Sequence, residues 1–300
     1  MTRLGISLCI AVTLPPLMML PPGWAQTRGA RSDEPTREAA TEEQRAQERW
    51  EFTLDSRIGA PSGRLKVGEF PATGGTAGGE PGTRLRLSAA GIHVSEVLEG
   101  SVAFHLTSRD AIRAGYLYSF LRGDSTPGQS VVYNGEEFKP GHLHTNADFS
   151  RLSLAYERAL LSSVGRRVVG SLGLTYVYFN PTLSGHGRSN SEDFYLQELP
   201  VPIAGLRLDQ ALGGHWLARL AVAGGGLPRV DSLRQEGGTV HLRQSHADTD
   251  AGLVYRWRAG VELELGYHFT YFLQHERSRE DDNLFELTDS GARARVRVRF

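Results

Sequence analysis

The last nine residues of the chain carry an alternation that few folds can accommodate. From Ala292 to Phe300, alanine, valine and phenylalanine alternate with four arginines. Because successive side chains of a β-strand point to opposite faces, this segment is predicted to be a strand with one apolar face and one arginine face. The strand ends on an aromatic residue. We expect such a strand to separate a polar interior from an apolar surrounding.

The same period of two recurs along the chain from Trp50 onward. Its longest example has an unbroken apolar face from Val261 to Leu273, which exceeds a typical soluble strand. A tilted strand needs roughly 9–11 residues to cross the hydrocarbon of a membrane. The fold class is therefore predicted to be all-β, an antiparallel up-and-down transmembrane β-barrel of about ten strands, with eight or twelve as alternatives. The predicted strands cover residues 50–58, 84–106, 111–121, 144–160, 168–179, 195–210, 215–223, 240–257, 261–275 and 289–300. The second contains the sequence from Ser88 to Gly91, which could be a bulge or a short helix.

The lengths of the predicted connections support a membrane barrel. Short links are expected at 107–110, 162–166, 212–214 and 258–260, and long polar links at 59–83, 122–143, 180–194, 224–239 and 276–288. Short and long links alternate, as they do in outer-membrane barrels with tight periplasmic turns and long extracellular loops. A soluble β-sandwich also has regular turns, but it needs no such alternation.

The first 49 residues divide into two segments of different character. Arg3, an apolar run and Ala25 have the order of a signal peptide, so we predict a cleaved signal peptide over 1–25. Four prolines in this segment disfavour a spanning helix, although an uncleaved anchor is the alternative. Residues 26–49 are charged and nearly free of large apolar side chains, which predicts a periplasmic linker, disordered or partly helical. The barrel is expected over 50–300.

Composition argues against several classes of function. The net charge of -1 gives no electrostatic attraction to nucleic acid. The single cysteine, Cys9, lies in the predicted signal peptide, so no disulfide or thiolate metal site is expected in the exported chain. Two histidine pairs, His142 with His144 and His241 with His246, could bind a metal, but no third ligand is evident. We therefore predict no cofactor and no metal.

The arginine face of the last strand is predicted to line the barrel lumen. The preceding strand sends Glu262, Glu264 and His268 to the same side, and antiparallel pairing is expected to place the two glutamates near Arg297 and Arg299. The first strand, which must pair with the last to close the barrel, adds Glu51 and Asp55. The predicted lumen network is Arg293, Arg295, Arg297, Arg299, Glu262, Glu264, His268, Glu51 and Asp55. Since buried charges need partners, a network that fills the lumen is favoured over a charge-lined pore for anions.

Two short motifs raise the possibility of catalysis. His246, Asp248 and Asp250 are spaced by two and could activate water. The group is similar to the His and Asp groups of the omptin proteases, which are ten-stranded, but a second pair of aspartates is not found at a corresponding place. His93 and Ser95 have the His-x-Ser spacing of outer-membrane phospholipases and lipid A deacylases without the expected surroundings. No catalytic residue is assigned, and an enzyme is the less favoured hypothesis.

The chain resembles Gram-negative outer-membrane β-barrel proteins in its predicted signal peptide, its even strand count and its final residue, Phe300. The resemblance covers residues 50–300 and implies that Phe300 is read by the barrel-assembly machinery. Segments 82–87 and 199–206 are similar to small outer-membrane barrel proteins of unassigned role. The expected function is a structural or weakly pore-forming barrel in contact with outer-membrane lipid and lipopolysaccharide, with small solutes as a possible cargo. A barrel-rim hydrolase acting on lipid or peptide and a carrier of a small apolar ligand are the alternatives.

Overall fold

The computed structural model describes residues 49–69, 82–192, 199–235, 239–258, 260–278 and 281–300. The predicted signal peptide and residues 26–48 of the predicted linker lie outside this part of the chain. Among the described residues, no helix has the length and apolar character needed to cross a membrane.

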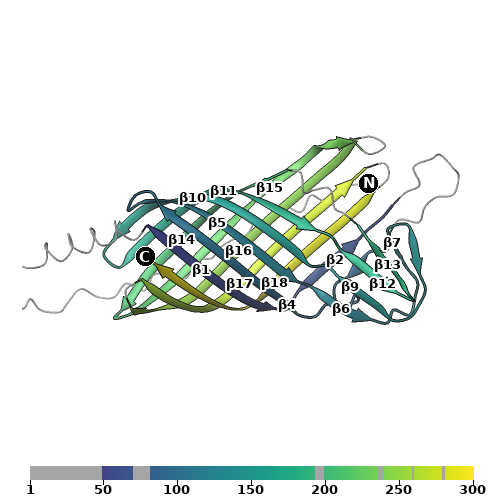
Figure 1. The fold of residues 1–300 in the computed structure, drawn as a ribbon, viewed down its shortest axis with the longest axis horizontal. Coiled ribbons are helices and arrows are strands. Elements are labelled where there is room, and N and C mark those ends of the chain that lie inside the picture. Colours follow the sequence, from purple (N-terminus) through teal and green to yellow (C-terminus); the bar gives the residue numbers. More distant parts are fainter. Residues whose placement is uncertain (1–48, 70–81, 193–198, 236–238, 259, 279–280) are drawn as a thin grey trace, which may run out of the picture. The chain divides into compact units, whose positions relative to one another are not determined.

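Ten antiparallel strands form a closed barrel, which confirms the predicted fold class (Figure 1). In chain order they are β1 (Trp50–Gly59), β4 (Ser95–His105), β5 (Asp110–Phe120), β10 (Phe149–Ser163), β11 (Arg166–Phe179), β14 (Val201–Gly213), β15 (Trp216–Gln235), β16 (Thr239–Arg258), β17 (Val261–Arg277) and β18 (Asp282–Arg299). Each strand pairs with its neighbour in this order, and β1 pairs with β18 to close the ring. At the seam, the backbone N–H groups of Trp50 and Phe300 each donate to the other residue's carbonyl at 3.0 Å.

The predicted second strand, 84–106, is divided in the structure. β3 (Leu85–Arg86) and β4 are separated by a turn in which the Ile92 N–H donates to the Leu87 carbonyl at 2.9 Å. The interruption is therefore neither the bulge nor the helix that the sequence suggested. Gly91 makes the turn possible, because its φ of 82° lies in the left-handed region and a Cβ there would meet the Asp124 backbone.

Two predicted loops are largely strand. β15 continues to Gln235 through the predicted link 224–239, and β18 begins at Asp282 inside the predicted link 276–288. The glycines and Pro228 of β15 have the composition of a turn. However, Pro228 falls where the β15–β16 register shifts between Leu227 and Val230, and a bulge tolerates the missing N–H of proline.

The barrel has a short-turn end, where links such as 164–165 and 214–215 join its strands, and a loop end. At the loop end, a cap is formed by β2 (Ser62–Lys66), β3, the turn at 87–94, β6 (Arg122–Ser125), β7 (Val131–Tyr133), β8 (Glu136–Phe138), β9 (Leu143–Asn146), β12 (Thr182–Gly185) and β13 (Arg188–Ser191). Figure 1 shows β6, β7, β9, β12 and β13 gathered at this end. β6, β9, β12 and β13 form one small sheet, and β7 pairs with β8.

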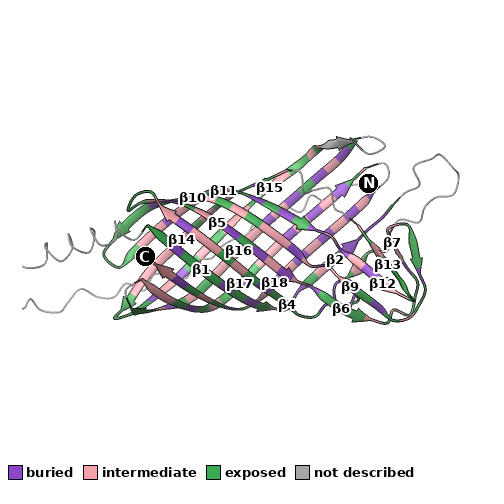
Figure 2. Ribbon diagram, in the orientation of Figure 1, coloured by how far each residue is buried: buried purple, intermediate pink, exposed green. Residues whose placement is uncertain are grey.

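Exposed and buried residues alternate along the barrel strands (Figure 2). The outward positions carry large apolar side chains around the whole barrel, among them Leu54, Leu98, Tyr116, Leu154, Leu172, Leu206, Leu220, Leu253, Leu265 and Val296. Leu265 is 71% exposed and Leu172 67% exposed. An apolar surface of this extent is unfavourable in water and suits a lipid environment. We call this surface the apolar belt.

Candidate functional site in the barrel lumen

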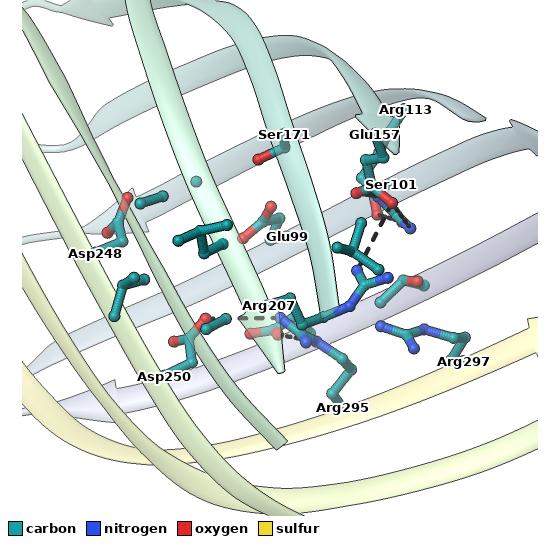
Figure 3. A pocket seen from close by; sticks show the side chains of 18 of the residues that line it. Glu99, Ser101, Arg113, Glu157, Ser171, Arg207, Asp248, Asp250, Arg295 and Arg297 are labelled. Atoms are coloured by element: carbon teal, nitrogen blue, oxygen red, sulfur yellow. Dashed lines mark hydrogen bonds and ion pairs between the residues drawn. The ribbon is translucent and has the colours of Figure 1, made fainter. Parts of the chain in front are cut away.

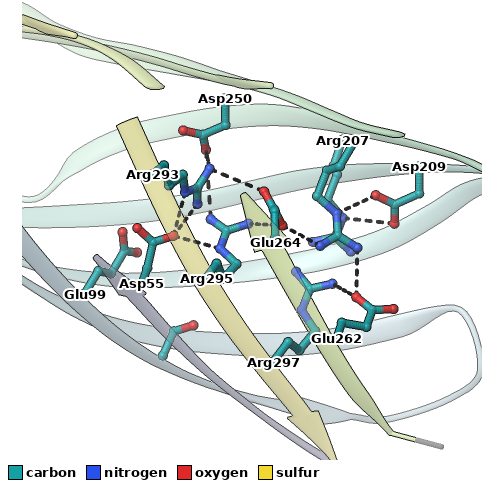
Figure 4. Close-up of polar contacts among 12 residues, drawn as sticks. Asp55, Glu99, Arg207, Asp209, Asp250, Glu262, Glu264, Arg293, Arg295 and Arg297 are labelled. Atoms are coloured by element: carbon teal, nitrogen blue, oxygen red, sulfur yellow. Dashed lines mark hydrogen bonds and ion pairs between the residues drawn. The ribbon is translucent and has the colours of Figure 1, made fainter. Parts of the chain in front are cut away.

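The carboxylates of β1 bind several arginines at once (Figure 4). Asp55 accepts hydrogen bonds from Arg293 at 2.6 Å, from Arg295 at 2.7 Å and from Arg57 at 2.9 Å. Its side chain and that of Arg293 are each 1% exposed. Because a lone buried charge is strongly disfavoured, these groups hold one another in the lumen.

Glu51 forms a second cluster of the same kind closer to the short-turn end. It accepts from Arg113 at 2.6 Å and Arg299 at 2.7 Å, and Arg297 lies 3.2 Å away. Arg113 belongs to β5, so this contact reaches past β4. The network therefore ties strands that are not neighbours in the sheet.

The glutamates of β17 pair with the last strand in a slightly different register from the predicted one. Glu262 lies opposite Arg297 and accepts from it at 3.1 Å. Glu264 lies opposite Arg295, at 3.4 Å, and not beside Arg299. The difference arises because Val261 pairs with Val298 at the start of the hairpin. Both glutamates also accept from Arg219 of β15, at 3.1 and 2.8 Å.

His268 contacts a carboxylate that was not among the residues with which it was grouped. Its Nε2 lies 3.2 Å from an Asp289 carboxylate oxygen, and both side chains are buried. This pair lies nearer the loop end than the ion pairs of Glu262 and Glu264.

Many members of the lumen network escaped the sequence interpretation. They are Arg57, Glu99, Arg113, Arg151, Glu157, Arg207, Asp209, Arg219, Asp248 and Asp250. Each occupies an inward position of an alternating strand, as Arg113 does between Ile112 and Ala114. The alternation of each strand was the available signal for the inward face, but the partner of each charge depends on the barrel's cross-section. Together with the predicted charged members, these residues form the charged layer.

One ion pair of the charged layer joins opposite walls. Arg151 on β10 donates to Asp248 on β16 at 3.0 Å. In the ring of strands, β11, β14 and β15 lie between them on the shorter side. Asp248 is also fixed by the Thr270 hydroxyl, which donates to it at 2.8 Å. This transverse bridge crosses part of the lumen.

A cavity of about 220 Å³ lies within the charged layer (Figure 3). One wall carries small residues of β11, β14 and β15, namely Ser171, Gly205, Ala221 and Ala223. The facing side carries charged side chains, including Arg151, Asp248 and Arg295. The cavity thus exists where small side chains leave room that the arginines do not occupy.

Between the charged layer and the loop end, the side chains that fill the lumen are apolar. Four phenylalanine rings pack together there, and we call them the apolar layer: Phe149, Phe179, Phe272 and Phe285. The ring centroids of Phe149 and Phe272 are 5.6 Å apart, and those of Phe179 and Phe285 are 4.3 Å apart. Cap residues such as Leu87, Leu143 and Leu183 belong to the same buried cluster. The cap and the barrel therefore share one hydrophobic core at the loop end.

The residues considered for catalysis lie in different settings. The His246 ring packs on the edge of Phe272 at 4.7 Å, while Asp248 and Asp250 pair with Arg151 and Arg293. Figure 3 shows both aspartates directed into the charged layer. Ser95 is buried, whereas His93 is exposed.

The histidines considered for metal binding meet a carboxylate on the cap. His142 and His144 lie 3.4 and 3.1 Å from the same Asp124 oxygen. Among the described residues, no group of three or more histidine, cysteine or carboxylate side chains has an arrangement that could hold a metal ion.

The cap also contains a carboxyl group with an unusual titration. Burial, followed by the nearby carboxylates of Asp281 and Glu69, raises the pKa of Glu192 to about 7. Asn283 donates to Glu192 at 3.4 Å and partly offsets this effect. Glu192 follows β13, Asp281 precedes β18 and Glu69 follows β2, so the group joins three segments of the loop end.

In this closed barrel, which has an apolar exterior and a charged interior, each of the ten strands pairs with two neighbours. The backbone groups of the wall thus bond between strands, as crossing a bilayer requires. The chain is a transmembrane β-barrel of the outer-membrane type. No protein-family model and no curated protein matches its sequence.

Several solved outer-membrane barrels are similar to this barrel in fold. The outer membrane protease OmpT from Escherichia coli has a TM-score of 0.48 and 12% identity, over 83% of this chain and 97% of that one. The translocator domain of the autotransporter NalP from Neisseria meningitidis has a TM-score of 0.41 and 13% identity, over 89% and 98%. Neisserial surface protein A has a TM-score of 0.31 and 9% identity, over 84% and 97%. At these values the likeness contributes no argument about activity.

Proposed function

We propose that this protein is a structural barrel of the outer membrane with a closed lumen, which carries its folded cap on the cell surface. The transverse Arg151–Asp248 bridge is the observation that carries the proposal. An open channel needs a continuous bore, and this bridge lies across it. The apolar layer and the cap form a second obstruction on the same path.

The energetic cost of opening the charged layer supports a permanent closure. Arg219, Arg293 and Arg297 are each at most 3% exposed at the side chain and are held by carboxylates from other strands. Separating one buried charge from its partner costs roughly 3–5 kcal/mol. A solute that moved through this layer would have to separate several such pairs together.

Weak conduction is the second candidate, and the cavity favours it. About 220 Å³ beside Ser171, Gly205 and Ala221 gives water and small ions a place inside the charged layer. A path along this small-residue wall would bypass the transverse bridge without breaking it. Such a path would still have to pass the apolar layer.

The proposed location sets the orientation and the partners. With the short-turn end in the periplasm and the loop end outside, as in other barrels of this type, the cap faces the medium. A cleaved signal peptide over 1–25 and recognition of Phe300 by the barrel-assembly machinery belong to the same proposal. Lipid and lipopolysaccharide would surround the apolar belt.

The positions of the other candidate residues favour structural roles for them. Asp248 forms an ion pair with Arg151, and Asp250 forms one with Arg293. Both carboxylates are therefore neutralised within the lumen. The space that a small apolar ligand would need at the loop end is occupied by the protein's own phenylalanines.

Conductance of the purified, folded protein in planar bilayers tests the proposal. The wild-type protein is expected to give no conductance steps. Large, stable steps would overturn the closed-barrel proposal. Small steps that disappear in the variant Ala221→Leu, which fills the cavity, would establish weak conduction along the small-residue wall in its place. Ala218→Leu, an outward change on the same strand, is the matched control.

A further inference from the structure

We propose that the outward face of β16, β17, β18, β2 and β3 at the loop end binds the phosphate groups of lipid headgroups in the outer leaflet. This inference rests on the proposed location in the outer membrane. We call the surface the basic face, and its basic side chains are Arg64, Arg86, Arg243, Arg277, His241 and His275.

The strand register brings these side chains together from four strands, β16 and β17 on one side of β18 and β2 and β3 on the other. Arg243 of β16 lies opposite His275 of β17, and His241 lies opposite Arg277. On the other side of β18, Arg64 of β2 lies opposite Arg86 of β3. Cross-strand partners on one face are about 4.5–5.5 Å apart at Cβ. The residues of β16 and β17 thus form one cluster and those of β2 and β3 a second, and β18 lies between the two clusters.

The basic face begins where the apolar belt ends. Along β17, the outward residues change from Phe269, Tyr271 and Leu273 to His275 and Arg277. Two residues advance a strand by roughly 7 Å, which is about the thickness of the headgroup region on one side of the hydrocarbon. The cations therefore lie at the depth where lipid phosphates are expected.

Several arginines of the basic face have no carboxylate partner in the described part of the chain. Glu286 pairs with Arg64 at 3.1 Å, Asp282 contacts His275 at 3.0 Å, and Asp231 contacts His241 at 2.8 Å. No carboxylate in the described part of the chain lies within ion-pairing distance of Arg86, Arg243 or Arg277, and all three are exposed. A guanidinium group binds phosphate through two parallel hydrogen bonds, so these three supply the chemistry that a phosphate needs.

On the opposite flank of the barrel, the arginine that follows β5 is paired. At the loop end, Arg122 of β6 is engaged at 2.6 Å by Asp148, the residue before β10, and Asp148 also accepts from the hydroxyl of Tyr118 on β5 at 3.1 Å. Arg122 is therefore already neutralised by a carboxylate, unlike Arg86, Arg243 and Arg277 of the basic face.

Native mass spectrometry of the folded barrel in detergent, with added lipid A, tests the proposal. The wild-type protein is expected to retain bound lipid A. The double variant Arg243→Gln/Arg277→Gln is expected to bind it at least roughly tenfold more weakly, since each charge-assisted contact contributes more than a neutral hydrogen bond. Arg158→Gln/Arg166→Gln, which removes two exposed arginines at the short-turn end, is the matched control and is expected to bind like the wild type.

Three results would overturn the inference: equal binding by wild type and double variant, an equal loss in the control, or equal binding of lipid A from which the phosphates have been removed. Competition by inorganic phosphate at millimolar concentration would assign the site to free phosphate and would also contradict it. The proposal of a closed lumen is judged by conductance alone, so conductance steps would leave the lipid result standing.

Discussion

The charged layer and the apolar layer are formed by the same strands, but the inward side chains of the first are charged and those of the second are aromatic. On β17, the inward positions change from Glu262 and Glu264 to Phe272 within the length of one strand, and on β18 they change from Arg293 to Phe285. Both layers are buried, yet only the apolar layer resembles the core of a soluble protein. Position along the barrel axis, and not burial alone, separates the two.

The reason lies in what each layer can pack against. A ten-stranded barrel is too wide for aliphatic side chains to meet at its centre. At the loop end the cap inserts residues such as Leu87 and Leu143, so that apolar side chains from two sides fill the space. The charged layer has no such insertion among the described residues, and only long arginine side chains reach partners such as Asp248 from across the lumen.

The largest expected effect is in the charged layer, where Asp55→Ala leaves Arg57, Arg293 and Arg295 without their common partner. We expect a loss of roughly 3–5 kcal/mol in the free energy of unfolding, measured by urea unfolding in lipid vesicles. Asp55→Asn, which keeps the shape and removes the charge, should lie between the variant and the wild type. A loss below about 1 kcal/mol for Asp55→Ala would mean that the other carboxylate partners of these arginines, Glu99, Asp250 and Glu264, are sufficient to stabilise them.

In the apolar layer, Phe285→Ala removes a fully buried ring that stacks on Phe179 at 4.3 Å. A loss of about 3 kcal/mol is expected, the low end of the range for such truncations. It should appear as faster proteolysis of the cap, while the membrane-embedded barrel persists. Phe285→Leu, a smaller change, should lose less. Equal loss of the whole barrel would show that the two layers unfold as one unit.

Two adjacent residues of β18 test the assignment of its faces. Val296→Asp places a charge on the apolar belt and should impair assembly, at a cost of up to roughly 2 kcal/mol. Arg297→Ala changes the lumen side, where Glu51 and Glu262 keep Arg299 and Arg219 as partners, so insertion should continue. Heat-dependent mobility on gels reports assembly of each variant. The opposite order of effects would reverse the two faces.

The smallest effect concerns the cap and depends on pH. The pKa of Glu192 rises from 4.5 to about 7 in the folded protein. The folded state therefore retains a proton that the unfolded chain releases, so this group lowers the free energy of unfolding as the pH rises from about 4.5 to 7, with little change above 7. The protection factors of the cap amides, which compare the exchange rate with that of an unfolded chain at the same pH, should fall over this interval in the wild type. Glu192→Gln should remove that part of the pH dependence, and an unchanged profile would assign it to another group.

Sequence alternation was sufficient to predict the barrel, its strand count and the pairing of the first strand with the last. It was not sufficient for the ends of the strands beyond the membrane. There, glycine and proline in 224–228 indicated a turn, whereas pairing with β16 keeps the segment extended to Gln235. The composition of a segment indicates which backbone conformations it can take, but pairing with the neighbouring strand determines which of them it has in the folded protein.

By itself, the sequence determined which residues face lipid and which face the lumen, because a period of two assigns faces without knowledge of any partner. Only the tertiary structure decided how the lumen charges are matched. Arg151 and Asp248 are separated by almost a hundred residues and by three strands, and nothing local in either strand indicates that they meet. The closure of the ring brings them to 3.0 Å from each other, because it places β10 and β16 on facing sides of the lumen.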